Sequence, residues 1–397
     1  MDLSAAFDIV DHSIFLDKLK VYKFSDQSIQ WFASYLSDRK QIVQVESKFS
    51  DPEDLAEHGV PQGSILGPLI FIIFNNDFPA NSVEGESVLY ADDDTANVAD
   101  DDPEELKNKI QREAIRSTDG VGDNRMVCSG DKTKLLIIGT SQLKKSKLPN
   151  TNTKVQIEVC GQTVVESRSE KLLGLIVNNQ LTWKEYLYGE HWREKGNASG
   201  LIPQLGQRVG LLRRVVHLMP KKKFQAVCQG IFYSKMCYCL QVVGNVWGVD
   251  TQDEVNRRFS AFTKEDNRKL QTLQNMVLRM KTKMPRRTPT KTLLALSGDL
   301  SVQQLTAQAT LTSLQKVIHN GKPEYIANKL NLNTMNTRQE NTLRQNCKLT
   351  MTRGAFFYRA SVLFSNLPPE MRTRMEPRIF KAKAKAWVRQ NIPPRPP

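Results

Sequence analysis

The chain has 397 residues, a length that predicts two or three domains. With 40% hydrophobic and 25% charged residues it can bury a full core, so its composition excludes an intrinsically disordered protein. The sequence has no apolar run of about 18 residues, and its N-terminus lacks the basic flank and apolar stretch of a secretory signal. We therefore expect an intracellular protein without a membrane span.

Charge divides the chain into two unequal parts. Residues 1–130 contain 25 acidic and 11 basic residues, whereas residues 131–397 contain 17 acidic and 45 basic residues, so the net charges are −14 and +28. A positive excess of this size predicts a polyanionic partner for the second part. The carboxylates of the first part are then expected to serve a different purpose.

The six cysteines form no CxxC pair, and the chain has only five histidines. This pattern predicts neither a disulfide framework nor a zinc site. We expect reduced, mostly buried thiols at positions 128, 160, 228, 237, 239 and 347.

The first part of the chain alternates helix and strand signals in short units. Residues 12–22 and 25–36 carry apolar side chains on one helical face, and Ser25 is an N-cap candidate for the second helix. QIVQV, at residues 41–45, has the β-branched content of a strand. A turn rich in glycine and proline follows at residues 59–67, and an apolar helix comes after it.

Hairpin signals dominate the next stretch. SVLYADDDTANVA, at residues 87–99, predicts a β-hairpin with carboxylates at its tip. Residues 101–117 begin with an acidic turn and a proline, which indicate the start of a helix. KTKLLIIGT at 132–140 predicts a buried strand, and residues 154–167 and 171–183 each predict a hairpin, the first turning at Cys160 and Gly161.

Strand signals fade beyond about residue 185. The following region predicts helices with apolar faces, interrupted at Pro203 and Pro220. Residues 301–320 predict another helix, and a basic tail ends in NIPPRPP, which we expect to fray.

The acidic segment YADDD, at residues 90–94, has two interpretations. Adjacent carboxylates repel one another, so the tip could be a solvated turn. Alternatively it is a metal site, because apolar strands hold the tip rigidly and Asp2 and Asp8 form a second acidic cluster in the same part of the chain. Mg²⁺ prefers oxygen ligands that are shared between one or two carboxylates and substrate phosphates. A pair of such ions about 4 Å apart can activate a 3′ hydroxyl and stabilise a leaving pyrophosphate.

Five motifs occur in one order along about 180 residues: DLSAAFDIVDH, GVPQGSILGP, YADDDT, DKTKLLIIGT and KLLGLIVNNQLTW. Their order and spacing resemble those of the palm motifs of reverse transcriptases. Their amino-acid sequences are similar to those of non-LTR (LINE-like, jockey-type) retrotransposons. The segment YRASVLFSNLPPEMR, followed by a Lys-rich helix, is similar to the tail that such elements carry after the polymerase.

The resemblance implies an α/β (α+β) polymerase palm, with an antiparallel sheet and helices on one face, over residues 1–185. A mainly helical thumb-like or connector region would occupy residues 186–300, and a basic helical C-terminal region residues 301–397. The chain begins one residue before the aspartate of the first motif. By the resemblance, the fingers region is therefore missing and the chain is N-terminally truncated.

The resemblance also implies a role for individual residues in the first part. Asp2, Asp92 and Asp93 would be the catalytic metal-binding aspartates, and the backbone carbonyl of Leu3 would be a further metal ligand. Phe7, five residues after Asp2, would be the aromatic gate under the nucleotide sugar; packing in the core is its alternative.

Three further roles follow from the same motifs. Gln62 and Gly63 would touch the incoming nucleotide and the template base, unless Gln62 is a plain loop residue. Lys132 or Lys134 would be the cation near the leaving pyrophosphate, and thus a candidate general acid. The turn at Leu173 and Gly174 would grip the primer end.

Several residues have a structural interpretation that we prefer to a functional one. Asp8 and Asp11 are expected to cap the following helix rather than to bind metal. Asp94 is expected to be a solvated turn residue, and His12 and His58 are expected to be ordinary polar residues.

The basic part of the chain offers weaker signals. Each basic run, taken alone, is expected to be a solvated face. Candidate phosphate contacts are Arg213, Arg214, Lys221, Lys222, Lys223, Lys283, Arg286 and Arg287. The aromatic residues of the segment 356–359 could stack on bases, although we favour packing in the core.

Together these features predict an RNA-directed DNA polymerase that transfers nucleotides from dNTP to a primer 3′ hydroxyl. The resemblance implies Mg²⁺, with Mn²⁺ as a substitute, an RNA template and a DNA primer, no membrane, and a nuclear location with a cytoplasmic phase. The alternative is a catalytically inactive nucleic-acid-binding remnant, and a third possibility is an unstable gene fragment. The sequence sets no oligomeric state.

Overall fold

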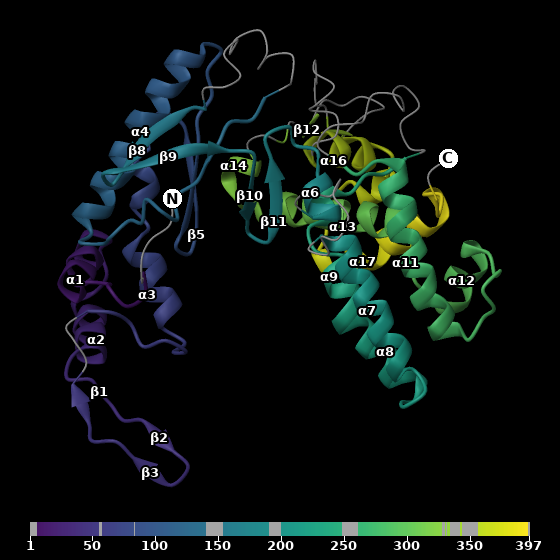
Figure 1. Ribbon diagram of the computed structural model, residues 1–397, viewed down its shortest axis with the longest axis horizontal. Helices are drawn as coiled ribbons and strands as arrows, with labels where there is room; N and C mark the ends of the chain where they lie inside the picture. The colour runs from purple at the N-terminus through teal and green to yellow at the C-terminus, as the bar shows by residue number, and fades with distance from the viewer. Residues whose placement is uncertain are drawn as a thin grey trace. The chain divides into compact units, whose positions relative to one another are not determined.

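The computed structural model describes residues 6–54, 58–82, 84–139, 154–189, 200–247, 261–327, 330, 332–333, 342–343 and 356–395. The chain forms two compact units, Met1–Arg168 and Ser169–Pro397 (Figure 1). The proposed domain limits at residues 185 and 300 stay predictions. Among the helices of the described ranges, none has the length and apolarity to cross a membrane.

The first unit begins with two helices that bury their predicted faces. α1 (His12–Val21) starts after Asp11, which caps it, and buries Phe15 and Leu19. α2 (Asp26–Leu36) starts after Ser25, the predicted N-cap, whose hydroxyl accepts a hydrogen bond from the N–H of Ser28. The apolar helix α3 (Gly67–Phe74) packs against α1, and the three helices share one hydrophobic core.

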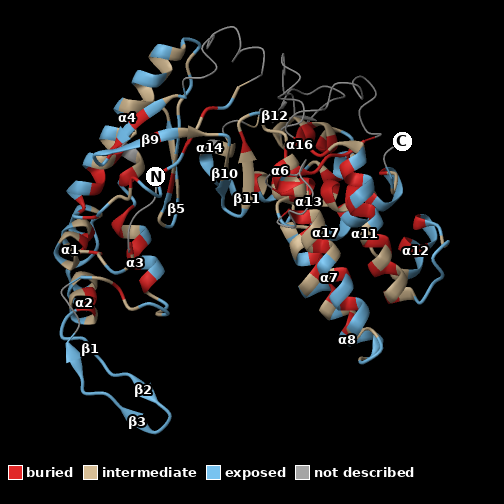
Figure 2. Cartoon of the chain, in the orientation of Figure 1, coloured by how far each residue is buried: buried red, intermediate tan, exposed pale blue. Residues whose placement is uncertain are grey.

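A narrow ribbon of short strands follows α2. The strands are β1 (Lys40–Gln41), paired with β4 (Glu53–Asp54), and β2 (Gln44–Val45), paired with β3 (Lys48–Phe49). The prediction of one strand over residues 41–45 is therefore wrong, since the pairing is interrupted at residues 42 and 43. All residues of these strands are exposed (Figure 2), so no buried face stabilises a continuous strand.

The remaining elements of the first unit form small sheets beside a long helix. A 3₁₀ turn, η1 (Phe78–Asn81), leads into the antiparallel pair β5 (Glu86–Tyr90) and β6 (Asp93–Asn97), and then into α4 (Pro103–Asp123). The hairpin of β8 (Gln156–Val159) and β9 (Gln162–Ser167) turns at Cys160 and Gly161, as predicted. β7 (Leu135–Leu136) is shorter than predicted, because it pairs with β9 over only two residues, in parallel.

The second unit is mainly helical. It opens with the predicted hairpin of β10 (Ser169–Leu172) and β11 (Leu175–Asn178). The helices that follow are α6 (Lys184–Tyr188), α7 (Leu201–Val215), α8 (Lys221–Cys228), the π-helix η2 (Gln229–Tyr233), α9 (Ser234–Met236), α10 (Leu240–Val243), α11 (Lys264–Thr282), α12 (Thr290–Ser297), α13 (Val302–Asn320), α14 (Glu324–Ala327), α16 (Phe356–Ser365), the 3₁₀ turn η3 (Pro369–Met371) and α17 (Pro377–Asn391). A short pair, β12 (Leu332–Asn333) and β13 (Thr342–Leu343), lies between α14 and α16.

Two proline positions behave differently in these helices. Pro220 separates α7 from α8, as predicted, and is the N-cap of α8. The expected interruption at Pro203 is wrong, because this residue lies in the first turn of α7. A backbone nitrogen in the first turn has no partner within its helix, so a proline there costs no hydrogen bond.

The two larger hydrophobic clusters among the described residues of the second unit organise its helices. One gathers residues of α6, α7, α8, η2 and α11, with Leu205, Leu212 and Phe232 fully buried. The other lies where α13 packs against α16 and α17, and includes Leu311, Phe364 and Phe380. This mixture of helices and small, mainly antiparallel sheets agrees with the predicted α/β class of fold.

The C-terminal tail is not frayed over its described residues, contrary to expectation. Ile392 is buried, and its carbonyl accepts a hydrogen bond from the side-chain amide of Gln304 at 2.9 Å. The amide of Gln303 donates to the carbonyl of Pro393 at 3.3 Å. The tail is ordered because buried glutamines of α13 satisfy its backbone.

The expectation that all cysteines are reduced is also wrong. The structure joins Cys128 to Cys160 through a disulfide. The turn between β8 and β9 brings Cys160 close to the segment that follows α4, with the two Cα atoms 6.8 Å apart. Cys228, Cys237 and Cys239 are free thiols, and burial raises the pKa of Cys228 to about 11 and that of Cys237 to about 12. Cys347 lies outside the described residues.

Candidate active site

The tip of the β5–β6 hairpin is a two-residue turn. Tyr90 pairs with Asp93, so Ala91 and Asp92 alone connect the strands. Ala91 has a φ of 56°, in the left-handed region that favours glycine. Asp92 is partly exposed and Asp93 is exposed, which leaves both carboxylates accessible.

Asp94 differs from its two neighbours. It lies opposite Leu89, on the face of the hairpin that turns inward, and is only 4% exposed. The hydroxyl of Ser87 donates to its carboxylate at 2.5 Å. Burial raises the pKa of Asp94, and the hydrogen bond from Ser87 opposes this rise. The expectation of a solvated turn residue is therefore wrong, because successive strand residues point to opposite faces.

The loop that contains GVPQG runs beside the segment that follows the first motif. The N–H of Gly59 donates to the carbonyl of Val10, and the N–H of Val60 donates to the carbonyl of Phe7, both at 2.8 Å. A Cβ atom on Gly59 would lie 2.8 Å from the carbonyl oxygen of Asp8. Glycine at this position therefore permits the close approach of the two segments.

Side chains reinforce this contact. The amide of Gln62 donates to the carboxylate of Asp8 at 2.9 Å, and a ring nitrogen of His12 lies 2.7 Å from the carbonyl of Gly59. Asp11 caps α1 as predicted, whereas Asp8 does not cap it. Burial acts to raise the pKa of Asp11, but hydrogen bonds from Ser13, the Ile14 N–H and Arg125 lower it to about 2.

Gly63 follows Gln62 in an open part of the loop. It has a φ of 83°, and a Cβ atom there would meet nothing within 4 Å. Both Gln62 and Gly63 are exposed. The two predicted nucleotide-contacting residues therefore lie together on an accessible turn.

Phe7 is partly buried against the core of the first unit. Its ring stacks on that of Phe71 in α3, with centroids 4.4 Å apart and an angle of 24° between the ring planes. Leu89 of the hairpin packs against the same core. Phe7, the GVPQG loop and the hairpin are thus built on one hydrophobic cluster.

Lys132 is exposed in the loop before β7, and Lys134 donates to the carbonyl of Asp131 at 3.0 Å. Within the described residues, no hydrogen bond or ion pair joins Lys132 to Asp92 or Asp93. Asp2 and Leu3 lie outside the described residues. The structure therefore brings together only part of the predicted site.

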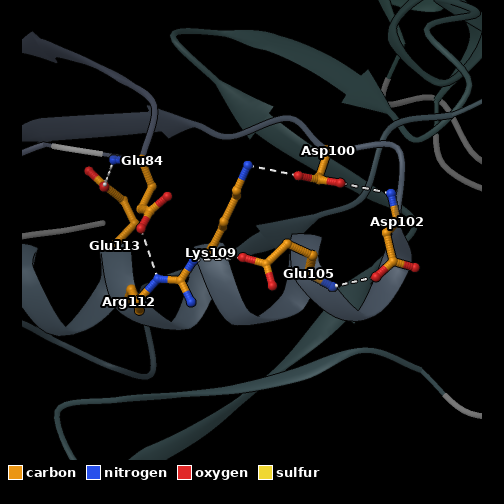
Figure 3. A network of polar contacts seen from close by, with 7 residues as sticks. All are labelled: Glu84, Asp100, Asp102, Glu105, Lys109, Arg112 and Glu113. Atoms are coloured by element: carbon orange, nitrogen blue, oxygen red, sulfur yellow. Dashed lines mark hydrogen bonds and ion pairs between the residues drawn. The ribbon is translucent and has the colours of Figure 1, made fainter.

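A polar network holds the base of the hairpin, at the opposite end from Asp92 and Asp93. Figure 3 shows this network, in which residues on either side of the two strands contact α4. Arg112 bonds to Glu84, which precedes β5, and to Glu105, each at 2.8 Å. Lys109 bonds to Asp100, which follows β6, at 2.7 Å.

Two further contacts complete the network. Asp102 caps α4 by accepting from the N–H of Glu105, and the buried Glu113 accepts from the N–H of Glu84 at 3.2 Å. Hydrogen bonding to Arg112 lowers the pKa of Glu84. Both strands of the hairpin are therefore fixed to one helix at their base, which restricts where the tip can lie.

The carboxylates of the tip suit a divalent cation only in part. Asp92 and Asp93 offer two adjacent oxygen donors, a number that Mg²⁺ commonly takes from protein before substrate phosphates complete its shell. The parts of the chain that the structure describes contain no group of three or more His, Cys, Asp or Glu residues placed to hold a metal. Asp94 is buried and accepts a hydrogen bond from Ser87, so it is not presented beside the carboxylates of the tip as a third ligand.

All eight predicted phosphate contacts are exposed in the second unit. Arg213 and Arg214 lie in the last turn of α7, and Lys221, Lys222 and Lys223 form the first turn of α8. Lys283, Arg286 and Arg287 are exposed in the turn between α11 and α12. Arg359, by contrast, is buried and bonds to the carbonyls of Gln241 and Val242.

Sequence reasoning missed the contact between Gln62 and Asp8 and the network at the base of the hairpin. Both depend on tertiary approach. One signal was available, namely Gly59, because a residue without a side chain permits the close approach of two backbones.

The model for the family "Reverse transcriptase (RNA-dependent DNA polymerase)" matches residues 1–177. The chain is also similar to the "Probable RNA-directed DNA polymerase from transposon BS" of Drosophila melanogaster, with 26% identity over 294 residues, or 72% of this chain and 29% of the relative. It is 26% identical over 275 residues to the "RNA-directed DNA polymerase from mobile element jockey" of the same species, which covers 65% of this chain and 26% of the relative.

A higher identity is confined to a shorter stretch. The jockey polymerase of Drosophila funebris is 40% identical over 100 residues, which is 23% of this chain and 11% of that relative. The chain thus spans between about a quarter and three tenths of the length of the first two relatives. Residues 1–177 therefore carry a match to the reverse transcriptase family, in a chain that is similar to the polymerases of the Drosophila jockey and BS elements.

Proposed function

We propose that the chain is an RNA-directed DNA polymerase, which adds a nucleotide from dNTP to the 3′ hydroxyl of a DNA primer on an RNA template. The observation that carries this proposal is the hairpin tip, where a tight turn presents Asp92 and Asp93 while its base is fixed to α4. The match of residues 1–177 to the family supports it.

Asp92 and Asp93, together with Asp2 and the carbonyl of Leu3, would hold Mg²⁺ or Mn²⁺. The bound ions would lower the pKa of the attacking hydroxyl and stabilise charge on the leaving pyrophosphate. The protein's part is to keep two accessible carboxylates adjacent on a rigid turn, which the short loop between Tyr90 and Asp93 supports.

The other first-unit residues would bind and orient the nucleotide. Stacking on Phe71 fixes the ring of Phe7, as a steric gate under the sugar requires. Gln62 and the open backbone of Gly63 would touch the base and its template partner. Lys132, which is exposed, would approach the pyrophosphate and is the candidate general acid.

The larger assignments belong to the same proposal. The first unit would be the palm, and the helices of the second unit the thumb-like region and the basic C-terminal region. The exposed cations of α7 and α8 support contact with the phosphates of template and primer. A nuclear location with a cytoplasmic phase would follow from this activity on chromosomal DNA.

Primer extension on an RNA template tests the proposal. With Mg²⁺ and dNTP, we expect extension by the wild-type chain and a loss of at least about a hundredfold in Asp92→Asn, since a carboxylate at a metal site is not replaced by an amide. Asp123→Asn, at an exposed residue near the end of α4, is the matched control and should keep full activity. Equal extension by wild type and the double variant Asp92→Asn, Asp93→Asn would refute the metal assignment.

A second candidate is a nucleic-acid-binding remnant without catalysis, which the exposed basic residues of α7 and α8 favour. It predicts binding of RNA or DNA in which the logarithm of the association constant falls linearly with the logarithm of the salt concentration. Neither Mg²⁺ nor Asp92→Asn should change this binding. Strong binding by a wild-type chain that extends no primer would select this candidate over the polymerase.

A further inference from the structure

A polar cavity of about 470 Å³ lies within the second unit, away from the proposed catalytic residues in sequence and in unit. One face of α11 lines it, through side chains spaced as neighbours on a helix, and the segment after α17 contributes a further lining residue. The lining residues are Arg268, Gln271, Thr272, Asn275 and Arg395. Every one of them is polar, and two carry a permanent positive charge.

Buried amides at the floor of this cavity have fixed orientations. The backbone N–H of Val302 can only donate, and it does so to the side-chain oxygen of Gln271 at 3.0 Å. The amino group of Gln271 consequently faces the side-chain oxygen of Asn275, 3.0 Å away. The amino group of Asn275 is thereby directed to the other side, where it donates to the hydroxyl of Thr290 at 3.0 Å.

The second guanidinium is also held in place. Arg395 bonds to the hydroxyl oxygen of Thr290, the same atom that Asn275 contacts. The backbone leading to Arg395 is anchored where Gln304 and Gln303 bond to the carbonyls of Ile392 and Pro393. A side chain that the sequence places in a frayed tail is thus positioned at a defined cavity wall.

Charge selects the class of ligand. Among the residues that the structure describes, no carboxylate lines the cavity, and Glu265, one turn before Arg268, is paired with Lys269 at 2.9 Å. Two guanidinium groups exclude a cation, and the polar lining disfavours an apolar molecule. Guanidinium groups match the oxygens of a phosphate in geometry as well as charge.

We propose that this cavity binds a phosphate group. Its volume lies within the range of about 300–1,000 Å³ typical of small-ligand sites, so it can take a phosphate together with part of the molecule that carries it. The group could be free phosphate or a phosphate of a nucleic-acid strand. Arg268 and Arg395 grip it, and the cavity acts independently of the proposed polymerase site.

Calorimetric titration of the full chain with inorganic phosphate, without Mg²⁺, tests the proposal. We expect saturable binding at one site, weakened by about tenfold or more in Arg268→Gln, because a charge-assisted hydrogen bond is lost. Arg268 is exposed, so this variant should fold. Arg286→Gln removes an equally exposed arginine outside the cavity and should bind phosphate as the wild type does.

Two outcomes would overturn the proposal: no saturable binding of phosphate by the wild type, or equal weakening by Arg268→Gln and Arg286→Gln. Competition then identifies the source of the phosphate. If a short oligonucleotide displaces inorganic phosphate, the site binds a phosphate of a nucleic-acid strand. If only the 5′-phosphorylated oligonucleotide does so, the site requires a terminal phosphate. Asp92→Asn should leave phosphate binding intact, which separates this site from the proposed polymerase activity.

Discussion

The side-chain amide of Gln62 donates a hydrogen bond to the carboxylate of Asp8 over 2.9 Å, joining two motifs that lie 54 residues apart. Beside it, the N–H groups of Gly59 and Val60 bond to the carbonyls of Val10 and Phe7. In the proposed enzyme, the loop that touches the nucleotide is therefore positioned by the segment that carries the aromatic gate. Displacing one should displace the other.

Gln62→Glu tests this coupling, because it places a second carboxylate beside Asp8. At pH 7 the repulsion should cost about 1 kcal/mol or less and lower the hydrogen-exchange protection of the Gly59 and Val60 amides by up to about fivefold. As the pH falls toward 4, the introduced glutamate takes up a proton and the loss should shrink. Gln62→Ala is the control, since it removes the bond without adding charge and should show no such pH dependence.

Ala91 sets the strain of the hairpin tip. A non-glycine residue in the left-handed region costs about 1–2 kcal/mol. Glycine removes this strain, but part of the gain is lost because glycine raises the conformational entropy of the unfolded chain. We expect Ala91→Gly to raise the free energy of unfolding of the first unit by up to about 1 kcal/mol, measured by denaturant unfolding. Ala91→Val should lower it, because a β-branched residue tolerates this region least. A less stable Ala91→Gly would show that the turn is not strained.

Local sequence signals located the helices and hairpins well. Ser25 was predicted as a cap of α2 from residue type alone, and the Cys160–Gly161 turn followed from two short apolar runs. The sequence did not indicate which strands gain a buried face. Residues 41–45 have strand-forming side chains, yet all their strand positions are exposed and the pairing breaks.

The candidate site was predictable in composition but not in detail. The acidic tip of the hairpin was expected, whereas the inward position of Asp94 depends on the pairing of Tyr90 with Asp93, which a one-residue shift would reverse. The bound C-terminal tail was missed for another reason. Gln303 and Gln304 are residues that usually face solvent, and here they are buried because they satisfy the tail's carbonyls.

Asp266 predicts a pH dependence for the second unit. Its side chain is 2% exposed and bonds to Lys184 of α6 at 2.8 Å, to the hydroxyl of Tyr188 at 2.7 Å and to Thr263. Burial by itself raises the pKa of Asp266, but the hydrogen bonds from Lys184, Thr263 and Tyr188 together lower it below its ordinary value of 3.8. The bonds therefore stabilise the fold above pH 3.8, and this contribution is lost as the pH falls through the lowered pKa.

Asp266→Asn should remove that contribution. We expect the free energy of unfolding at pH 7 to fall by roughly 2 kcal/mol, less than for a fully buried pair because Lys184 is partly exposed. The difference from wild type should narrow as the pH is lowered from 5 toward 2. Glu265→Gln, at the exposed neighbour that pairs with Lys269, should unfold as the wild type does. A difference that does not vary with pH would mean that the charge of Asp266 contributes nothing.

Arg359 distinguishes packing from nucleic-acid contact in α16. Its guanidinium donates to the carbonyls of Gln241 and Val242, at 2.7 and 2.9 Å, and so satisfies the end of α10. Arg359→Met should lower the free energy of unfolding by about 2 kcal/mol, because it leaves two part-buried carbonyls without this donor. The exposed Arg378 of α17 is the matched control, and Arg378→Met should change stability by no more than about 0.5 kcal/mol. If Arg359→Met instead weakened RNA binding with unchanged stability in urea unfolding, the buried role of Arg359 would be wrong.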